Sequence, residues 1–330
     1  MRHHRYYTRR RQQAKKPRRQ LLLACFFSTI LLLSGYGVLS FVKDSSKSSN
    51  TTIASQVKLT EDVPLAWPTT GKAAVGSIED GLLARSSKNE TPRPTASMAK
   101  VITALAIMEK QPFELGETGQ SYTLTSKDVA YYQTQVAQGG SALPVHAGMT
   151  LTQHEAMQAM LIASSNNLAE TLAERTFGSE EAYVEYAQSM VERMGLSQTT
   201  IADASGFNPA TTSTPSDLVA IGITALKNPV IADIVAQPEA QITDVGIIKN
   251  TNELLRTDGA VGIKTGTTNE AGSCLLFAAN YATKSGGGIT LVGVIMGDVS
   301  AATLFNDSRK LLVSAKQEFD LTDNRQRVLN

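Results

Sequence analysis

The sequence predicts a mixed α/β (α+β) domain, in which helices flank a mainly antiparallel five-stranded sheet and form a helical subdomain. Two strand patterns come early in the chain, helical patterns fill the middle, and three strand patterns return near the end. Short turns separate the paired strand patterns, which favours antiparallel pairing. The stretch "LVGVIM" is apolar on both faces of a strand, so we expect the sheet to be covered on both sides.

The N-terminal region has the charge pattern of a membrane anchor. Residues 1–19 carry nine Lys or Arg and no acid, and residues 21–42 carry no charge. An apolar helix of that length spans about 33 Å, enough to cross a bilayer core. We therefore expect a basic cytoplasmic tail (1–20), a transmembrane signal anchor (21–42) and a body outside the cytoplasm of a bacterial cell. A cleaved signal peptide, which would secrete the body, is the alternative.

The remainder of the chain is acidic and poor in cysteine. Without the basic tail it has 22 basic and 30 acidic residues, a net charge of −8. A nucleic-acid partner is therefore not expected, because a polyanion is attracted by the opposite charge. Outside the anchor the only cysteine is Cys274, so the body cannot form an internal disulfide and must be stabilised by packing.

Composition and periodicity divide the chain further. Residues 43–70 are rich in Ser and Thr and read as a linker, residues 71–319 as the catalytic domain, and residues 320–330 as a polar tail. A hairpin is expected over 72–86, because Asp80-Gly81 is a strong turn signal. The sequence predicts helices at 97–110, 152–163, 165–177, 179–194, 215–226 and 301–319, and further strands at 260–266, 273–281 and 289–297.

Ser97 and Lys100 form an S-x-x-K pair at the start of an apolar helix. Residues three apart share a helix face, so the lysine amine can reach the serine hydroxyl. A buried lysine with a lowered pKa can accept the proton of a serine nucleophile. Taken alone, the pair is also consistent with Thr95 or Ser97 acting as an ordinary helix cap.

Two further polar segments stand out, each with a plain structural alternative. Ser164-Ser165-Asn166 lies between two helices, where it could simply cap the second one. Lys264-Thr265-Gly266 lies in a strand, where the lysine could be an exposed edge residue and the glycine could allow close approach of a ligand.

Other catalytic signatures are missing from the sequence. Outside the basic tail only His146 and His154 remain, and neither belongs to an H-E-x-x-H motif. There is no G-x-S-x-G and no glycine-rich phosphate loop. A zinc peptidase or a Ser-His-Asp hydrolase is therefore poorly supported, and we expect no metal and no cofactor.

The three polar segments occur in the order S-x-x-K, S-x-N and K-T-G, with 67 and then 100 residues between their first members. This trio is the signature of penicillin-binding proteins and class A β-lactamases. With flanking text such as "ASMAKVITALAIME", "LIASSNNLAETLAE" and "NTNELLRTDGAVGIKTGTTNEAG", residues 70–319 resemble the D-alanyl-D-alanine carboxypeptidases, the low-molecular-mass penicillin-binding proteins of the serine β-lactamase-like superfamily. The resemblance implies a penicillin-binding/β-lactamase-like fold.

The resemblance also implies roles for the catalytic residues. Ser97 would be the acylated nucleophile, Lys100 would accept its proton, and Ser164 would pass a proton to the leaving amine. Water would then release the acyl group. The backbone amides of Ser97 and Thr267 would form the oxyanion hole.

The implied substrate is a peptidoglycan stem peptide that ends in D-Ala-D-Ala. Asn166 would hold the substrate amide, and Lys264 would help to keep Lys100 neutral. Together with Thr265, Gly266 and Thr267, Lys264 would form the segment that meets the terminal carboxylate. β-Lactams would be covalent inhibitors that acylate the same serine.

Three alternatives stay open at this point. Relatives often carry an arginine after the last core strand, but residues 298–308 contain no Lys or Arg, which leaves room for endopeptidase cleavage of cross-links. A β-lactamase needs a glutamate, commonly in E-x-x-L-N, and no such string lies between Ser164 and Lys264. A non-catalytic wall-binding module is disfavoured because all three motifs are intact.

Overall fold

The computed structural model describes residues 63–323 except residues 256 and 285, all within one compact unit, Gln56–Asn330. The predicted basic tail and anchor lie outside the described residues. Within the described part, no single helix is long and apolar enough to cross a membrane. One pair of consecutive helices, α7 (Pro215–Leu226) and α8 (Pro229–Ala236), is long and apolar enough only when the two are taken together. The pair bends by 103°, and both helices contribute buried side chains to the core.

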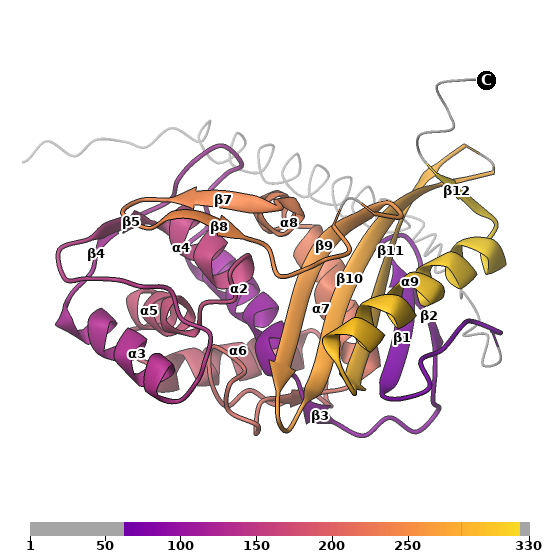
Figure 1. The fold of residues 1–330 in the computed structure, drawn as a ribbon, viewed down its shortest axis with the longest axis horizontal. Coiled ribbons are helices and arrows are strands. Elements are labelled where there is room, and N and C mark those ends of the chain that lie inside the picture. Colours follow the sequence, from indigo (N-terminus) through magenta and orange to yellow (C-terminus); the bar gives the residue numbers. More distant parts are fainter. Residues whose placement is uncertain (1–62, 256, 285, 324–330) are drawn as a thin grey trace, which may run out of the picture. The chain divides into compact units, whose positions relative to one another are not determined.

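A six-stranded antiparallel sheet forms one side of this unit (Figure 1). The long strand β10 pairs with β11 along one edge, and with β9 and then β12 along the other, while β1 and β2 continue the sheet beyond β11. The predicted antiparallel sheet built from both ends of the chain is therefore confirmed. The strands are β1 (Lys72–Ser77), β2 (Gly81–Arg85), β9 (Ala260–Thr268), β10 (Gly272–Thr283), β11 (Gly288–Asp298) and β12 (Leu321–Asp323).

The sixth strand, β12, lies in the segment that we expected to be a polar tail. Its three residues pair with Tyr281, Ala282 and Thr283, at the end of β10 that β9 does not reach. Leu321 is buried there against the same apolar cluster as Leu311 and Leu312 of helix α9 (Ala301–Glu318). A three-residue strand is too short for a periodic signal, so the sequence could not indicate it.

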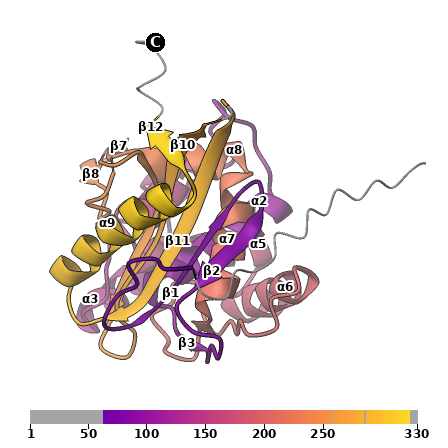
Figure 2. The same ribbon diagram turned by 90° about the vertical axis from the view of Figure 1, so that its right-hand side faces the viewer.

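Both faces of the sheet are covered, as the apolar strands require. Leu275, Phe277 and Ala279 of β10 point to the face that is covered by α9, and the alternating Leu276 and Ala278 point to the face that is covered by helix α7. Figure 2 shows α9 lying across one face of the sheet. The two apolar clusters therefore lie on opposite sides of one sheet.

The helical part packs beyond α7 and surrounds the buried helix α2. Side-chain caps begin several helices, since Thr152, Ser165, Ser179, Thr214 and Ser300 each accept a hydrogen bond from a backbone amide in the first turn. The remaining helices are α2 (Ala99–Lys110), α3 (Ser126–Ala137), α4 (Gln153–Leu161), α5 (Asn166–Phe177) and α6 (Glu180–Arg193), and short strand pairs are β3 (Arg93–Pro94) with β6 (Thr212–Ser213), β4 (Ser121–Thr123) with β5 (Thr150–Thr152), and β7 (Glu239–Ile242) with β8 (Gly246–Lys249).

The last residues of the predicted linker pack against the domain. Val63 and Leu65 are buried, and Trp67 packs against the same apolar cluster, beside α9. The backbone amide of Ala66 donates a hydrogen bond to the hydroxyl of Ser314, on α9. Apolar side chains at every second position of "VPLAW" explain why this stretch is held rather than left as a tether.

Candidate active site

Ser97 lies in a short 3₁₀ turn, Ala96–Met98, that leads directly into α2. Its neighbours Ala96 and Met98 are fully buried, so the turn is fixed by packing, while Ser97 itself is partly accessible. The first residues of α2, 99–104, are all buried. A nucleophile at this point is therefore held on a rigid element at the rim of the core.

Lys100, the second residue of α2, is completely buried, and its ammonium nitrogen meets three oxygen atoms. Nζ donates to the Ser97 hydroxyl at 2.9 Å, to the side-chain oxygen of Asn166 at 2.6 Å and to the backbone carbonyl of Ser205 at 2.8 Å. Two of these partners are carbonyl oxygens, which can only accept. The third partner, Ser97, is a hydroxyl, which can either accept or donate.

This geometry suits a lysine that gains and loses one proton. Burial lowers the pKa of Lys100 to about 7, although the acidic side chains of Asp203 and Glu170 act in the opposite direction. A neutral amine has two N–H donors for the two carbonyl oxygens and one lone pair, which then faces Ser97. Deprotonation of Lys100 thus reverses the direction of only one hydrogen bond, the one with Ser97. The Ser97 hydroxyl then donates to Lys100, and Lys100 can take its proton.

The segment Ser164-Ser165-Asn166 turns the chain from α4 into α5. Ser164 has a positive φ of 62°, which is rare for a residue other than glycine and marks a constrained corner. Ser165 caps α5, as the structural alternative expected, and Asn166 is its first residue. Ser164 is nearly buried, and its hydroxyl has no hydrogen bond to any other described side chain or backbone group.

The side chain of Asn166 is held at both ends. Its oxygen accepts from Lys100, and its Nδ2 donates to the side-chain oxygen of Gln135, on α3, at 2.7 Å. The backbone amide of Asn166 also donates to the carbonyl of Ser141. Asn166 therefore presents a fixed oxygen to Lys100, and the corner is tied to both neighbouring segments.

Strand β9 brings Lys264 to the same region. Lys264 is buried, so the interpretation of an exposed edge lysine is wrong. Burial and, after it, the charge of Lys100 hold the pKa of Lys264 well below its usual value. A charged Lys100 therefore opposes the protonation of Lys264.

Gly266 allows β9 to lie directly against the turn that carries Ser97. A Cβ atom at this position would lie 3.0 Å from both the Ser97 amide nitrogen and the Ala96 Cβ, closer than side chains normally approach. The intervening Thr265 pairs its hydroxyl with that of Thr251 at 2.5 Å, and Thr267 is exposed. The structure thus brings Ser97, Lys100 and Asn166 into direct contact and places the Lys264–Thr267 strand beside them.

Several residues of this site could not be identified from the sequence. The carbonyl of Ser205 has no sequence signal, because every residue has one. Gln135 belongs to α3, which was not predicted. Asp203 orders the Ser205 loop by accepting from the backbone amides of Ser205, Phe207 and Asn208, and the short polar stretch "DASGF" was its only indication.

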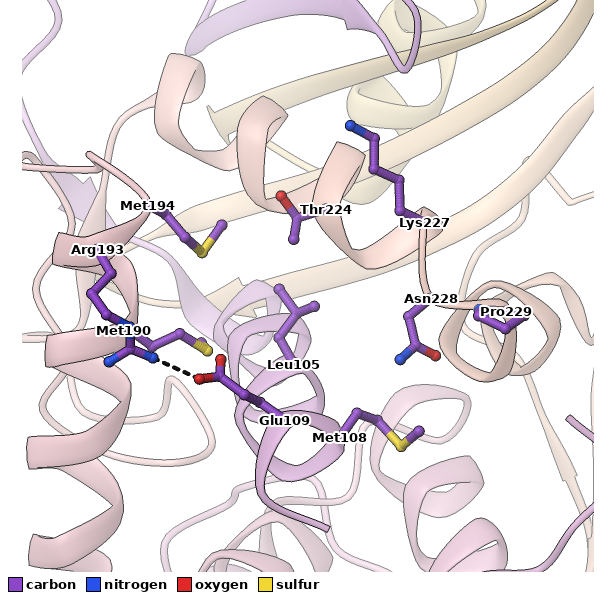
Figure 3. Close-up of a pocket in the computed structure, with 10 residues that line it drawn as sticks. All are labelled: Leu105, Met108, Glu109, Met190, Arg193, Met194, Thr224, Lys227, Asn228 and Pro229. Carbon is purple, nitrogen blue, oxygen red and sulfur yellow. Dashed lines mark hydrogen bonds and ion pairs between the residues drawn. The ribbon is translucent and has the colours of Figure 1, made fainter. Parts of the chain in front are cut away.

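A cavity of about 480 Å³ lies elsewhere, between the last turns of α2, α6 and α7 (Figure 3). Leu105, Met108 and Met190 contribute its apolar side chains, and Arg193 is paired with Glu109 at 2.7 Å. The residues that line it include none of Ser97, Lys100, Asn166 and Lys264. This cavity is therefore separate from the serine and lysine cluster. Among the described residues no group of three or more His, Cys, Asp or Glu could hold a metal ion.

Comparisons with known proteins agree with the motifs. The sequence profile described as D-alanyl-D-alanine carboxypeptidase matches residues 78–300. The D-alanyl-D-alanine carboxypeptidase DacB2 of Mycobacterium tuberculosis is 30% identical over 248 residues, 70% of this chain and 79% of that protein. A crystal structure of a D-alanyl-D-alanine carboxypeptidase from the same organism superposes with a TM-score of 0.67 at 27% identity, covering 78% of this chain and 95% of that one.

Some of the similar proteins are named as endopeptidases. A D-alanyl-D-alanine endopeptidase of Haemophilus influenzae is 26% identical over 217 residues, 64% of this chain and 69% of that protein.

Proposed function

The chain belongs to the D-alanyl-D-alanine carboxypeptidase family, and we propose that it removes the terminal D-alanine from peptidoglycan stem peptides through an acyl-enzyme on Ser97. The observation that carries this proposal is the buried Lys100 amine, 2.9 Å from the Ser97 hydroxyl and held there by Asn166 and Ser205. Serine is a weak nucleophile until a nearby group takes its proton. The Lys100 amine lies within hydrogen-bond reach of the Ser97 hydroxyl, which supports its role as the proton acceptor.

Acylation would proceed in two steps. The Ser97 oxygen attacks the carbonyl carbon of the penultimate D-alanine while Lys100 accepts the hydroxyl proton. The carbon–nitrogen bond then breaks, and the amine of the terminal D-alanine leaves with a proton that reaches it through Ser164. The unpaired Ser164 hydroxyl, at the constrained corner beside Asn166, supports this role because it is free to bond to the substrate.

The remaining residues would bind the substrate and its transition state. The amides of Ser97 and Thr267 would hold the developing oxyanion, a role supported by the contact of Gly266 with the Ser97 amide. Lys264, Thr265 and Thr267 would attract the terminal carboxylate, and Asn166 would hold the substrate amide. Water then hydrolyses the ester and regenerates Ser97. A β-lactam would acylate Ser97 in the same way and remain attached.

The substrate proposal is tested with a synthetic peptide. We expect the purified chain to release D-alanine from a peptide ending in D-Ala-D-Ala, and to release no alanine from the matched peptide ending in D-Ala-L-Ala. High-performance chromatography of free alanine measures both. Equal release from the two peptides, or none from either, would overturn the proposal.

Cleavage of cross-links is a second candidate function. It is favoured by the endopeptidase names among the relatives and by residues 298–308, where Val299 is exposed and no Lys or Arg is present to bind a terminal carboxylate. Incubation with cross-linked muropeptide dimers separates the two activities. Monomers without loss of D-alanine indicate an endopeptidase, and dimers that persist while D-alanine is released indicate a carboxypeptidase.

The rate of acylation is expected to depend on pH through Lys100. The amine must be neutral to accept the serine proton, and its pKa of about 7 lies far below that of an ordinary lysine because of burial. Below pH 7 acylation should therefore fall roughly tenfold for each pH unit, and above it the rate should reach a plateau. Stopped-flow acylation by a fluorescent penicillin measures this profile. A rate that stays constant between pH 5.5 and 8.5 contradicts the role given to Lys100.

We also propose that residues 21–42 anchor the chain in the bacterial membrane, with the N-terminus in the cytoplasm and the catalytic domain outside. The charge and length of the segment support this proposal. Protease treatment of whole spheroplasts that express the full chain tests the orientation, since protection of the catalytic domain would contradict it.

A further inference from the structure

Glu170 is connected to Lys100 by an unbroken series of hydrogen bonds. Lys100 donates to Asn166, whose Nδ2 donates to the oxygen of Gln135, and Gln135 in turn donates to one carboxylate oxygen of Glu170 at 2.5 Å. Asn166 and Glu170 lie four residues apart on α5, so both face the same side of the helix. Gln135 reaches them from α3.

The bridge is enclosed by the backbone of Gly140. A Cβ atom at Gly140 would lie 2.3 Å from the Gln135 side-chain oxygen and 2.8 Å from Asn166 Nδ2. The main chain at Gly140 therefore covers both side-chain amides, and it lies too close to them for any residue with a side chain at this position. Such a covered polar network has few ways to rearrange, because each buried group needs its partner.

The direction of the series is set by Glu170. An ionised carboxylate can only accept hydrogen bonds, so the amide nitrogen of Gln135 must point toward it. The oxygen of Gln135 then faces Asn166, and this fixes Asn166 with its own oxygen toward Lys100. Without an acceptor at position 170 the two amides could turn over together and present an N–H group to the amine.

Titratable groups from four elements interact with Glu170. They are Lys100 on α2, Tyr131 on α3, Glu180 on α6 and Asp203 in the following loop. The second carboxylate oxygen of Glu170 is buried and has no hydrogen-bond partner among residues 63–323 as far as they are described. Burial raises the pKa of Glu170 to about 7, with Glu180 and Asp203 acting in the same direction, while Gln135 and Lys100 lower it. Glu170 and Lys100 thus titrate in the same range and influence each other.

We propose that Glu170 is a positioning residue for acylation: through Gln135 it fixes Asn166 as the acceptor for Lys100, and its carboxylate stabilises the Lys100 ammonium that forms when Ser97 loses its proton. The proposal rests on the proposed function of Ser97 and Lys100. Glu170 does not touch the substrate. It makes Lys100 a stronger base, and its substitution should change both the rate and its pH dependence.

The test compares Glu170→Gln with the full wild-type chain in acylation by a fluorescent penicillin between pH 5 and 9. Loss of the negative charge should move the midpoint of the pH profile to lower pH by about half a unit or more and lower the plateau rate about tenfold. A purely structural defect would lower the rate without moving the midpoint to acid pH. The control is Glu174→Gln, one turn further along α5, where Glu174 pairs with the exposed Lys127 and should leave both values unchanged.

A second variant keeps the test decisive if Glu170→Gln does not fold. Gln135→Met breaks the series at its middle, and we expect a similar loss of plateau rate. The role of Glu170 would be overturned if the variant that folds has a plateau rate within twofold of the wild-type rate and a midpoint within 0.2 pH units of the wild-type midpoint. Failure of the proposed function looks different, because the wild-type chain would then form no penicillin adduct at any pH.

Discussion

A Lys100→Met variant is expected to be acylated by penicillin at least about 1,000-fold more slowly than the wild type. Methionine has a similar length and prefers a buried position, but it has no lone pair of comparable basicity. Ser97 would then have to lose its proton to water or to Ser164. The effect should appear as a loss of rate at all pH values, and the rising pH profile should disappear.

Two controls separate this chemical effect from a folding defect. Lys110→Met changes the exposed lysine at the end of the same helix and should leave acylation unchanged. Lys100→Arg keeps a cation for the two carbonyl oxygens but cannot accept a proton near neutral pH, so it should be as slow as Lys100→Met. Thermal unfolding of each variant is measured alongside. Acylation of a folded Lys100→Met at a rate within tenfold of the wild type would contradict a base at this position.

Ser97→Ala is expected to abolish D-alanine release while the domain stays folded. The Ser97 side chain is partly accessible, and within the described part of the chain its hydroxyl has a hydrogen bond only to Lys100, so its removal leaves the packing of Ala96 and Met98 in place. We expect a change in unfolding free energy of about 1 kcal/mol, as is usual for one hydrogen bond. Chromatographic assay of D-alanine and a urea titration measure the two effects. If the variant still released D-alanine, another residue would have to be the nucleophile, and Ser164 would be the first candidate.

Much of the fold follows from patterns that the sequence displays openly. The strands β1, β2, β9, β10 and β11 were expected from apolar runs and from turns such as Asp80-Gly81, and the observed boundaries lie close to the predicted ones. Helix α3 was missed because it is polar on most sides and buries only Asp128 and Gln135. Helix α8 was missed because it has only eight residues, too few for a clear helical period, and follows the predicted end of α7 after only Lys227 and Asn228.

In the site, the sequence motifs could be predicted, but the groups that surround and hold them could not. Ser97, Lys100 and Asn166 were identified because a rare order of motifs joined three weak signals. The partners that fix them were not identified, since Ser205 contributes a backbone carbonyl and Gln135 comes from the missed helix. The positive φ of Ser164 depends on how α4 and α5 pack, which no local pattern reports.

Mass spectrometry of the intact protein after incubation with benzylpenicillin tests the central claim most directly. The wild-type chain should gain the mass of one penicillin, on the peptide that contains Ser97, and Ser97→Ala should gain none. The adduct should persist after the free penicillin is removed, which also distinguishes this protein from a β-lactamase. No adduct on the wild type, or an equal adduct on Ser97→Ala, would contradict the assignment of Ser97 as the nucleophile.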